Sequence, residues 1–135
     1  MSLKEEERDT LVNLYLGKCD ETLNDARLTR DQGRWNASAN RLYYALFHAI
    51  TALFVSDGIP VHSHNGLIIK FGKEYVLTGL ATEDEGKLLS KMETMRERAD
   101  YDVTFTATEA IINERFGQVE QMIHHIKELV GRKRS

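Results

Sequence analysis

A single proline, Pro60, stands in this chain of 135 residues, so almost nothing in the sequence obliges a helix to stop. Inside a helix, proline removes a backbone hydrogen bond and clashes with the preceding turn. We therefore expect helices to end mainly at glycines, because glycine readily takes the left-handed conformation found at many helix C-termini. This distribution of breaks predicts an all-α fold.

Between the breaks, apolar residues recur every three or four positions, which is the spacing of the buried face of a helix. Over residues 11–28 this pattern predicts a helix that ends before Gly33. A second helix is expected to have Asn36 as its N-cap and to run to about Ser56, shortly before a Gly-Ile-Pro sequence.

The second half of the chain shows three further helix starts. His64 could open a short helix, and two capping boxes, Thr82-x-x-Glu85 and Thr106-x-x-Glu109, mark two longer ones. After the second box, an apolar seam suits either packing inside a bundle or a dimer face. The seam consists of Ile112, Phe116, Val119, Ile123, Ile126 and Val130. The predicted fold is an up-and-down bundle of four main helices plus a short extra helix.

Length and composition narrow the class of protein. The length favours a single domain over residues 1–135, with a basic C-terminal tail at 131–135. The net charge of −3 argues against a surface that binds nucleic acid over its whole area. The lone cysteine cannot form an internal disulfide, no apolar stretch reaches membrane-spanning length, and the first residues do not resemble a signal peptide. We therefore expect a cytoplasmic protein that is not embedded in a membrane.

The densest group of chemically useful residues lies in the second predicted helix. Arg41, Tyr44 and His48 are separated by three and four residues, so they form one polar stripe on that helix. Arginine can hold a phosphate, histidine can exchange a proton near neutral pH, and tyrosine can orient either group. The alternative is a structural role, in which Tyr44 and His48 are core residues and Arg41 closes a buried hydrogen-bond network.

A second group ends the fourth predicted helix and contains Arg96, Arg98, Asp100 and Tyr101. The two arginines are candidate phosphate ligands, and both are favourable near a helix C-terminus. Arg96 and Asp100 are four residues apart, so a simple surface ion pair explains them equally well.

The histidines are a further group of candidate metal ligands. His62 and His64 share a loop, whereas His124 and His125 are neighbours on one helix and cannot both face one site. Zinc sites usually need three or four convergent ligands, and the only thiol, Cys19, is expected in the core. We expect neither a metal nor another cofactor, and a helical metalloprotein remains the weakest of the alternatives.

Two sequence blocks carry a family resemblance. The first is Asn40-Arg41-Leu-Tyr43-Tyr44-Ala-Leu-Phe47-His48-Ala49, and the second is Arg96-x-x-Ala99-Asp100-Tyr101, with His64-Asn65-Gly66 and Thr78-Gly79 between them in the expected order. On these residues the chain resembles the HEPN domain family (higher eukaryotes and prokaryotes nucleotide-binding), and within it a branch of small stand-alone prokaryotic proteins. The resemblance spans nearly the whole chain.

The resemblance implies a helical bundle that is usually a homodimer. It also implies binding of RNA or a nucleotide, often in a toxin–antitoxin or defence module beside a minimal nucleotidyltransferase that serves as partner. Many members are metal-independent endoribonucleases. The alternative function is a non-enzymatic helical dimerisation or interaction module.

The family's nuclease motif is Arg-x(4–6)-His near the junction of the last two main helices. Arg96 or Arg98 matches its arginine, but positions 101 to 105 read Tyr-Asp-Val-Thr-Phe, without a histidine. We therefore expect a composite site across the bundle, with Arg96 and His48 as candidate catalytic residues. The candidate ligands of RNA or a nucleotide are Arg41, Tyr44, Arg98, Asp100 and Tyr101.

Overall fold

The computed structural model describes residues 4–132, and over this range it is helical without strands. The elements are α1 (Glu5–Asp31), α2 (Trp35–Asp57), α3 (His64–Phe71), the π-helical turn η1 (Gly72–Val76), α4 (Glu83–Tyr101) and α5 (Glu109–Gly131). The predicted all-α bundle of four main helices with a short extra helix is therefore confirmed.

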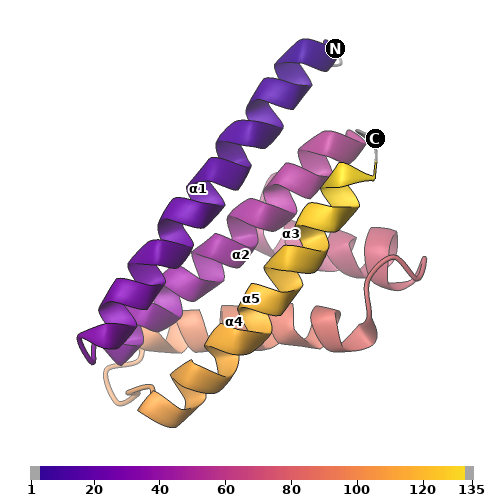
Figure 1. Cartoon of the computed structure of the whole chain (residues 1–135). Helices are drawn as coiled ribbons and strands as arrows, with labels where there is room; N and C mark the ends of the chain where they lie inside the picture. The colour runs from indigo at the N-terminus through magenta and orange to yellow at the C-terminus, as the bar shows by residue number, and fades with distance from the viewer. Residues whose placement is uncertain (1–3, 133–135) are drawn as a thin grey trace.

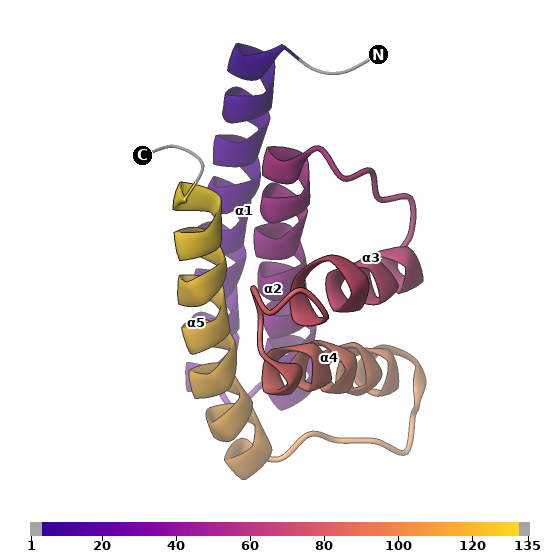
Figure 2. The same cartoon turned by 90° about the vertical axis from the view of Figure 1, so that its right-hand side faces the viewer.

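Helix α2 is the centre of the fold. It runs antiparallel to α1, α5 lies beside the pair, and α4 crosses these three helices, as the two views show (Figures 1 and 2). Apolar residues lie on several sides of α2, and Leu42, Ala45, Leu46 and Ala49 are fully buried. A helix with apolar residues on several sides must be covered on several sides, so α2 contributes residues to every interface that matters for the site below.

The predicted end points of the first two helices are correct, but the predicted start of α2 is not. Gly33 and Gly58 have φ angles of 72° and 73° and follow the two helices. The N-cap of α2 is Arg34, so Asn36 lies inside the first turn. Its side chain instead bridges to the α4–α5 loop, where Nδ2 donates to the Phe105 carbonyl at 3.2 Å and Oδ1 accepts from Ala107 N–H at 2.8 Å.

One of the two predicted capping boxes is present. Thr82 Oγ1 accepts from Glu85 N–H at 3.1 Å, and Glu85 Oε1 accepts from Thr82 N–H at 2.8 Å. The second box is wrong, because α5 has Thr108 as its N-cap. The bond from Ala107 N–H to Asn36 holds this part of the loop against α2, so the helix begins after it.

The apolar seam of α5 packs inside the chain. All six of its residues are 3% exposed or less. The seam is therefore part of the single-chain core and is not available as a dimer face.

The predicted basic C-terminal tail is described only in part. Of the predicted basic tail, residues 133–135 lie outside the described residues, whereas Arg132 Nη2 is 3.1 Å from Asp57 Oδ2 at the end of α2. Among residues 4–132, no helix combines the length and the hydropathy that crossing a bilayer requires.

Candidate functional site

The aromatic ring of Tyr44 is the meeting point of four side chains from three helices. The guanidinium carbons of Arg41 (α2) and Arg96 (α4) lie 5.6 and 5.8 Å from the ring centroid. The imidazole centroids of His64 (α3) and His48 (α2) lie 5.8 and 6.4 Å from it. We call these five residues the Tyr44 cluster. The predicted stripe of Arg41, Tyr44 and His48 thus lies opposite Arg96, as the sequence suggested.

Arg96 is buried, which the sequence did not indicate. Its side chain is 9% exposed and Nη2 donates to Glu93 Oε1 at 2.6 Å, while Nη1 is 3.7 Å from Asp100 Oδ2. The ion pair considered for Arg96 and Asp100 is therefore present, but it is not a simple surface pair, because the Arg96 side chain is buried. The closest partner is a carboxylate one helical turn earlier, itself only 10% exposed. Removing either member would leave an uncompensated charge in the protein interior.

Asp100 is also linked to α2, through Asn40. Asn40 Nδ2 donates to Asp100 Oδ2 at 3.0 Å, and Asn40 Oδ1 accepts from Arg41 Nε and Nη2 at 2.9 and 2.7 Å. These residues line a shallow pocket of about 410 Å³ between α2 and the end of α4. Arg41 is thus held in place while still bordering open space.

His64 is the residue that sequence reasoning missed as part of the site. It is the first residue of α3, where Ser63 rather than His64 supplies the N-cap. Its ring stacks on Phe47 with centroids 4.6 Å apart, and its Nδ1 is 2.9 Å from the Tyr43 hydroxyl. The available signals were the histidine itself and the His64-Asn65-Gly66 match to the family. Spacing along one helix cannot identify His64, because it contacts the cluster from a different helix.

The Tyr43 hydroxyl connects His64 to the Arg96–Glu93 pair. Tyr43 is fully buried. Burial raises the pKa of its hydroxyl, and the neighbouring Glu93 carboxylate raises this pKa further. The guanidinium of Arg96 also lies 5.3 Å from the Tyr43 ring centroid. The hydroxyl therefore remains protonated. With this hydroxyl donating to Glu93, Nδ1–H of His64 donates to the hydroxyl oxygen, which fixes the imidazole and leaves Nε2 unprotonated, as a general base requires.

His48 occupies the other end of the cluster. Its ring stacks on Tyr15 of α1 with centroids 6.5 Å apart, and its Nδ1 is buried without a hydrogen-bond partner in the described residues. Burial lowers the pKa of His48, and the positive charges of Lys18 and Arg41 lower it further. His48 is therefore held in the neutral form.

The lowered pKa of His48 predicts how the stability of the fold depends on pH. The unfolded chain binds a proton at His48 near its ordinary pKa of about 6.5, before the folded chain does. Acidification through this range should therefore favour unfolding, and stability contributed by neutral His48 is present above it. We expect the free energy of unfolding, measured with urea, to fall less from pH 7.5 to pH 5.5 in His48→Gln than in the unchanged chain. An equal fall in both chains would show that His48 does not cause the pH dependence.

Two predicted site residues lie outside the Tyr44 cluster. Arg98 lies on another side of α4, where its guanidinium carbon is 4.5 Å from the Phe105 ring centroid and Nε is 3.7 Å from Asp102 Oδ2. Tyr101 is the last residue of α4 and is 79% exposed. Of the seven candidate site residues, the structure brings together Arg41, Tyr44, His48 and Arg96, with Asp100 at the edge.

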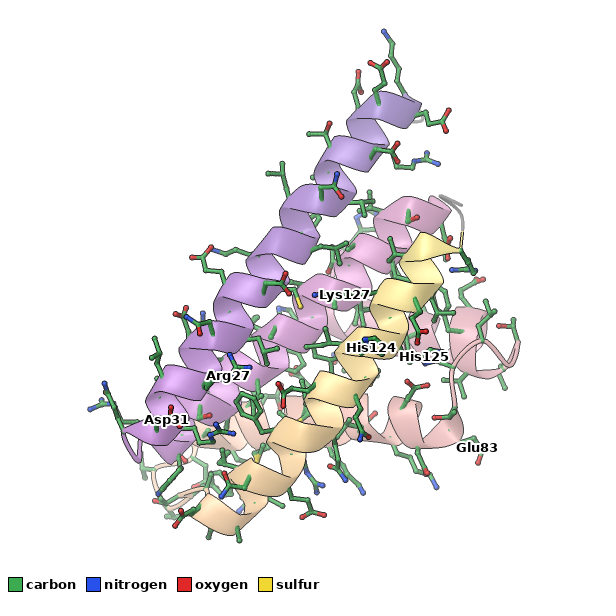
Figure 3. All side chains as sticks on the ribbon, in the orientation of Figure 1. Arg27, Asp31, Glu83, His124, His125 and Lys127 are labelled. Carbon is green, nitrogen blue, oxygen red and sulfur yellow. The ribbon has the colours of Figure 1, made fainter. Side chains whose placement is uncertain are left out.

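The remaining histidines and the cysteine do not gather around a common point. Figure 3 shows His124 and His125 side by side on α5, where His125 Nδ1 contacts Glu85 Oε2 at 2.7 Å and His124 Nε2 is 3.8 Å from Glu128. Burial raises the pKa of the Cys19 thiol to about 12. Within residues 4–132, no three His, Cys, Asp or Glu side chains are placed to share a metal ion.

Chemically, the Tyr44 cluster combines two cations with two imidazoles beside aromatic rings. Guanidinium groups stabilise phosphate charge, and imidazole exchanges protons near neutral pH. Aromatic rings and arginine planes provide surfaces on which nucleic-acid bases stack. The arrangement suits a phosphate-containing ligand with a base.

Comparisons with known proteins agree with the resemblance seen in the sequence. The chain is similar to a "UPF0332 protein" of Thermotoga maritima, with 27% identity over 124 residues, covering 92% of this chain and 94% of that protein. It is also similar to a protein of Methanocaldococcus jannaschii named "Putative toxin", with 29% identity covering 82% and 85% of the two chains. A "UPF0332 protein" of Pyrococcus horikoshii is 35% identical over 79 residues, covering 58% and 56%. The HEPN domain profile matches residues 12–132, and this chain therefore belongs to the HEPN domain family.

Proposed function

We propose that this protein binds RNA or a nucleotide in a toxin-type role and that the Tyr44 cluster is its site. Membership of the HEPN family and the relatives named as toxins support the general role. The observation that carries the proposal for the site is the convergence of Arg41, His48, His64 and Arg96 on one tyrosine ring, at 5.6 to 6.4 Å.

The residues of the cluster take three roles. Arg41 borders the pocket and is the proposed phosphate ligand. Arg96 is buried and paired with Glu93, so we assign it as a positioning residue that holds Glu93 and the two tyrosines. His64, fixed through Nδ1 by Tyr43, is the proposed acid–base group.

These roles support RNA cleavage without a metal ion. The His64 imidazole takes the proton of a ribose 2′-hydroxyl, whose oxygen attacks the adjacent phosphorus. The bond from phosphorus to the 5′-oxygen breaks and a 2′,3′-cyclic phosphate remains. The leaving oxygen takes a proton from water, and the resulting hydroxide takes back the proton held by His64. A positioned general base typically contributes 10²- to 10⁴-fold to such a step, and positive charge near the phosphate stabilises the transition state.

Two assays with the purified full chain test this proposal. Fluorescence anisotropy with labelled single-stranded RNA should show binding, and gel analysis in excess EDTA should show cleavage. An RNA with a single 2′-deoxy position should resist cleavage at that position only, because the attacking hydroxyl is missing there. A chain that neither binds RNA or nucleotides nor cleaves RNA would overturn the proposal.

We also propose that the chain forms a homodimer and associates with a minimal nucleotidyltransferase, as the family resemblance implies. Light scattering of the purified chain gives its mass in solution. Co-purification with such an enzyme from the same genome tests the second association.

A further inference from the structure

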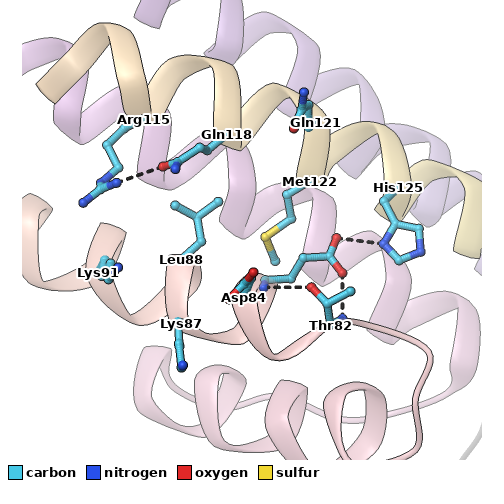
Figure 4. Close-up of a pocket in the computed structure, with 11 residues that line it drawn as sticks. Thr82, Asp84, Lys87, Leu88, Lys91, Arg115, Gln118, Gln121, Met122 and His125 are labelled. Carbon is cyan, nitrogen blue, oxygen red and sulfur yellow. Dashed lines mark hydrogen bonds and ion pairs between the residues drawn. The ribbon is translucent and has the colours of Figure 1, made fainter. Parts of the chain in front are cut away.

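A groove between α4 and α5 gathers positive charge away from the Tyr44 cluster. It consists of two adjoining pockets, of about 550 and 500 Å³, which share Lys91 and Arg115 in their linings. Lys87 lines the first pocket and Arg98 lines the second. In Figure 4, Lys87 and Lys91 project from α4 and Arg115 projects from α5. We call this feature the α4–α5 groove.

The cations are arranged along a line. Lys87, Lys91 and Arg98 are separated by four and seven residues and therefore share one side of α4. At a helical rise of about 1.5 Å per residue, they are spread over roughly 16 Å along the axis. A single small anion would need converging ligands, so this linear spacing fits an elongated polyanion better.

The groove is distinct from the Tyr44 cluster. Arg96 and Arg98 are two residues apart, which turns their side chains about 200° relative to one another on an α-helix. Arg96 accordingly points to α2 and contacts Tyr43 and Tyr44, whereas Arg98 packs over Phe105. This explains why the predicted ligand Arg98 is absent from the cluster.

The charge balance of the groove leaves positive charge for a ligand. Among residues 4–132, the side chains of Lys87 and Lys91 form no hydrogen bond or ion pair. Arg98 and Arg115 do have carboxylates nearby, with Asp102 at 3.7 Å and Glu114 at 3.9 Å. The first pocket also contains two acidic residues, Asp84 and Glu85.

The pocket at the Arg98 end has the composition expected for a nucleotide unit. No carboxylate is part of its lining, which combines cations with hydroxyl groups and with apolar surface from Met95, Phe105 and Ile111. Cations suit phosphates, hydroxyls suit ribose, and the Arg98–Phe105 pair offers a flat surface for a base.

We propose that the α4–α5 groove binds the backbone of single-stranded RNA, with phosphates along Lys87, Lys91 and Arg115 and a base near Phe105. The choice of RNA over an acidic protein segment rests on the proposed function above. The groove would hold the strand outside the reactive cluster, so it should contribute to binding more than to the chemical step.

The test compares two double variants that change the net charge equally. Lys87→Glu/Lys91→Glu alters two exposed groove residues, and Lys4→Glu/Lys73→Glu alters two exposed lysines outside the groove linings. The probe is a labelled 12-nucleotide single-stranded RNA, measured by anisotropy at several salt concentrations, after thermal melting shows that each variant is folded.

The groove variant should bind the RNA about tenfold more weakly or worse, and the slope of log K against log salt should fall by roughly 1.4, because two phosphate contacts are lost at about 0.7 each. The control should change the Kd by less than about twofold, since only distant screened charge differs. An unchanged Kd and slope in the groove variant, or an equal loss of affinity in the control, would overturn the proposal that the groove binds RNA. Either result would leave the proposed function intact. Binding of polyglutamate but not RNA would overturn both.

Discussion

Replacing Arg96 by methionine should lower the free energy of unfolding by about 3–5 kcal/mol, because the Glu93 carboxylate would remain buried without its cation. Both side chains of this pair are 10% exposed or less, and the closest contact between them is 2.6 Å. Methionine keeps much of the apolar length of arginine, so the loss reflects charge more than volume. Urea unfolding at neutral pH measures the difference.

A second variant separates the unpaired charge from other effects. Arg96→Met combined with Glu93→Gln replaces the buried pair by neutral groups and should recover most of the lost stability, since neutral replacements of buried ion pairs are often tolerated. The exposed arginine Arg34→Met supplies a control for loss of an arginine. A single variant as stable as the unchanged chain would show that the pair is not effectively buried in solution.

The recovered double variant also distinguishes the two functional readings. If Arg96 positions a reactive site, the refolded double variant should still cleave RNA poorly. If the polar residues only hold the helices together in an interaction module, restoring stability should also restore the association of the chain with its partner.

The helices themselves follow from local signals in the sequence. Gly33, Gly58 and the Thr82 capping box mark ends and starts that the chain adopts, because each depends on neighbouring residues alone. The start of α5 was misplaced because Thr106 and Thr108 offer similar caps. Only the contact between Asn36 and Ala107, 71 residues apart, decides between them.

The candidate site, like the helices, was predictable only where it depends on residues close together in the sequence. Helical spacing placed Arg41, Tyr44 and His48 together, because three residues on one helix need no knowledge of tertiary structure. It could not separate Arg96 from Arg98, since that depends on which side of α4 faces α2. His64 belongs to a short helix whose position is set by tertiary packing, through contacts with Tyr43 and Phe47.

His64→Gln should reduce single-turnover RNA cleavage by about 10²- to 10⁴-fold, the usual contribution of a positioned acid–base group. Glutamine keeps a polar side chain that can contact the Tyr43 hydroxyl, but it cannot exchange a proton near neutral pH. Binding of the same RNA should stay within about twofold, because the phosphate ligand Arg41 and the α4–α5 groove are unchanged. The rates are measured with saturating enzyme in EDTA.

Tyr43→Phe provides the matched test of positioning, because it removes the hydroxyl 2.9 Å from His64 Nδ1 and leaves the ring. Its cleavage rate should fall less than that of His64→Gln, since the imidazole remains but loses a neighbour that fixes one nitrogen. His48→Gln, at the opposite end of the cluster, should affect the rate least of the three. A large loss with His48→Gln and a normal rate with His64→Gln would assign the proton transfer to His48 instead, because both imidazoles lie beside Tyr44 and only one can be the group that meets the ribose hydroxyl.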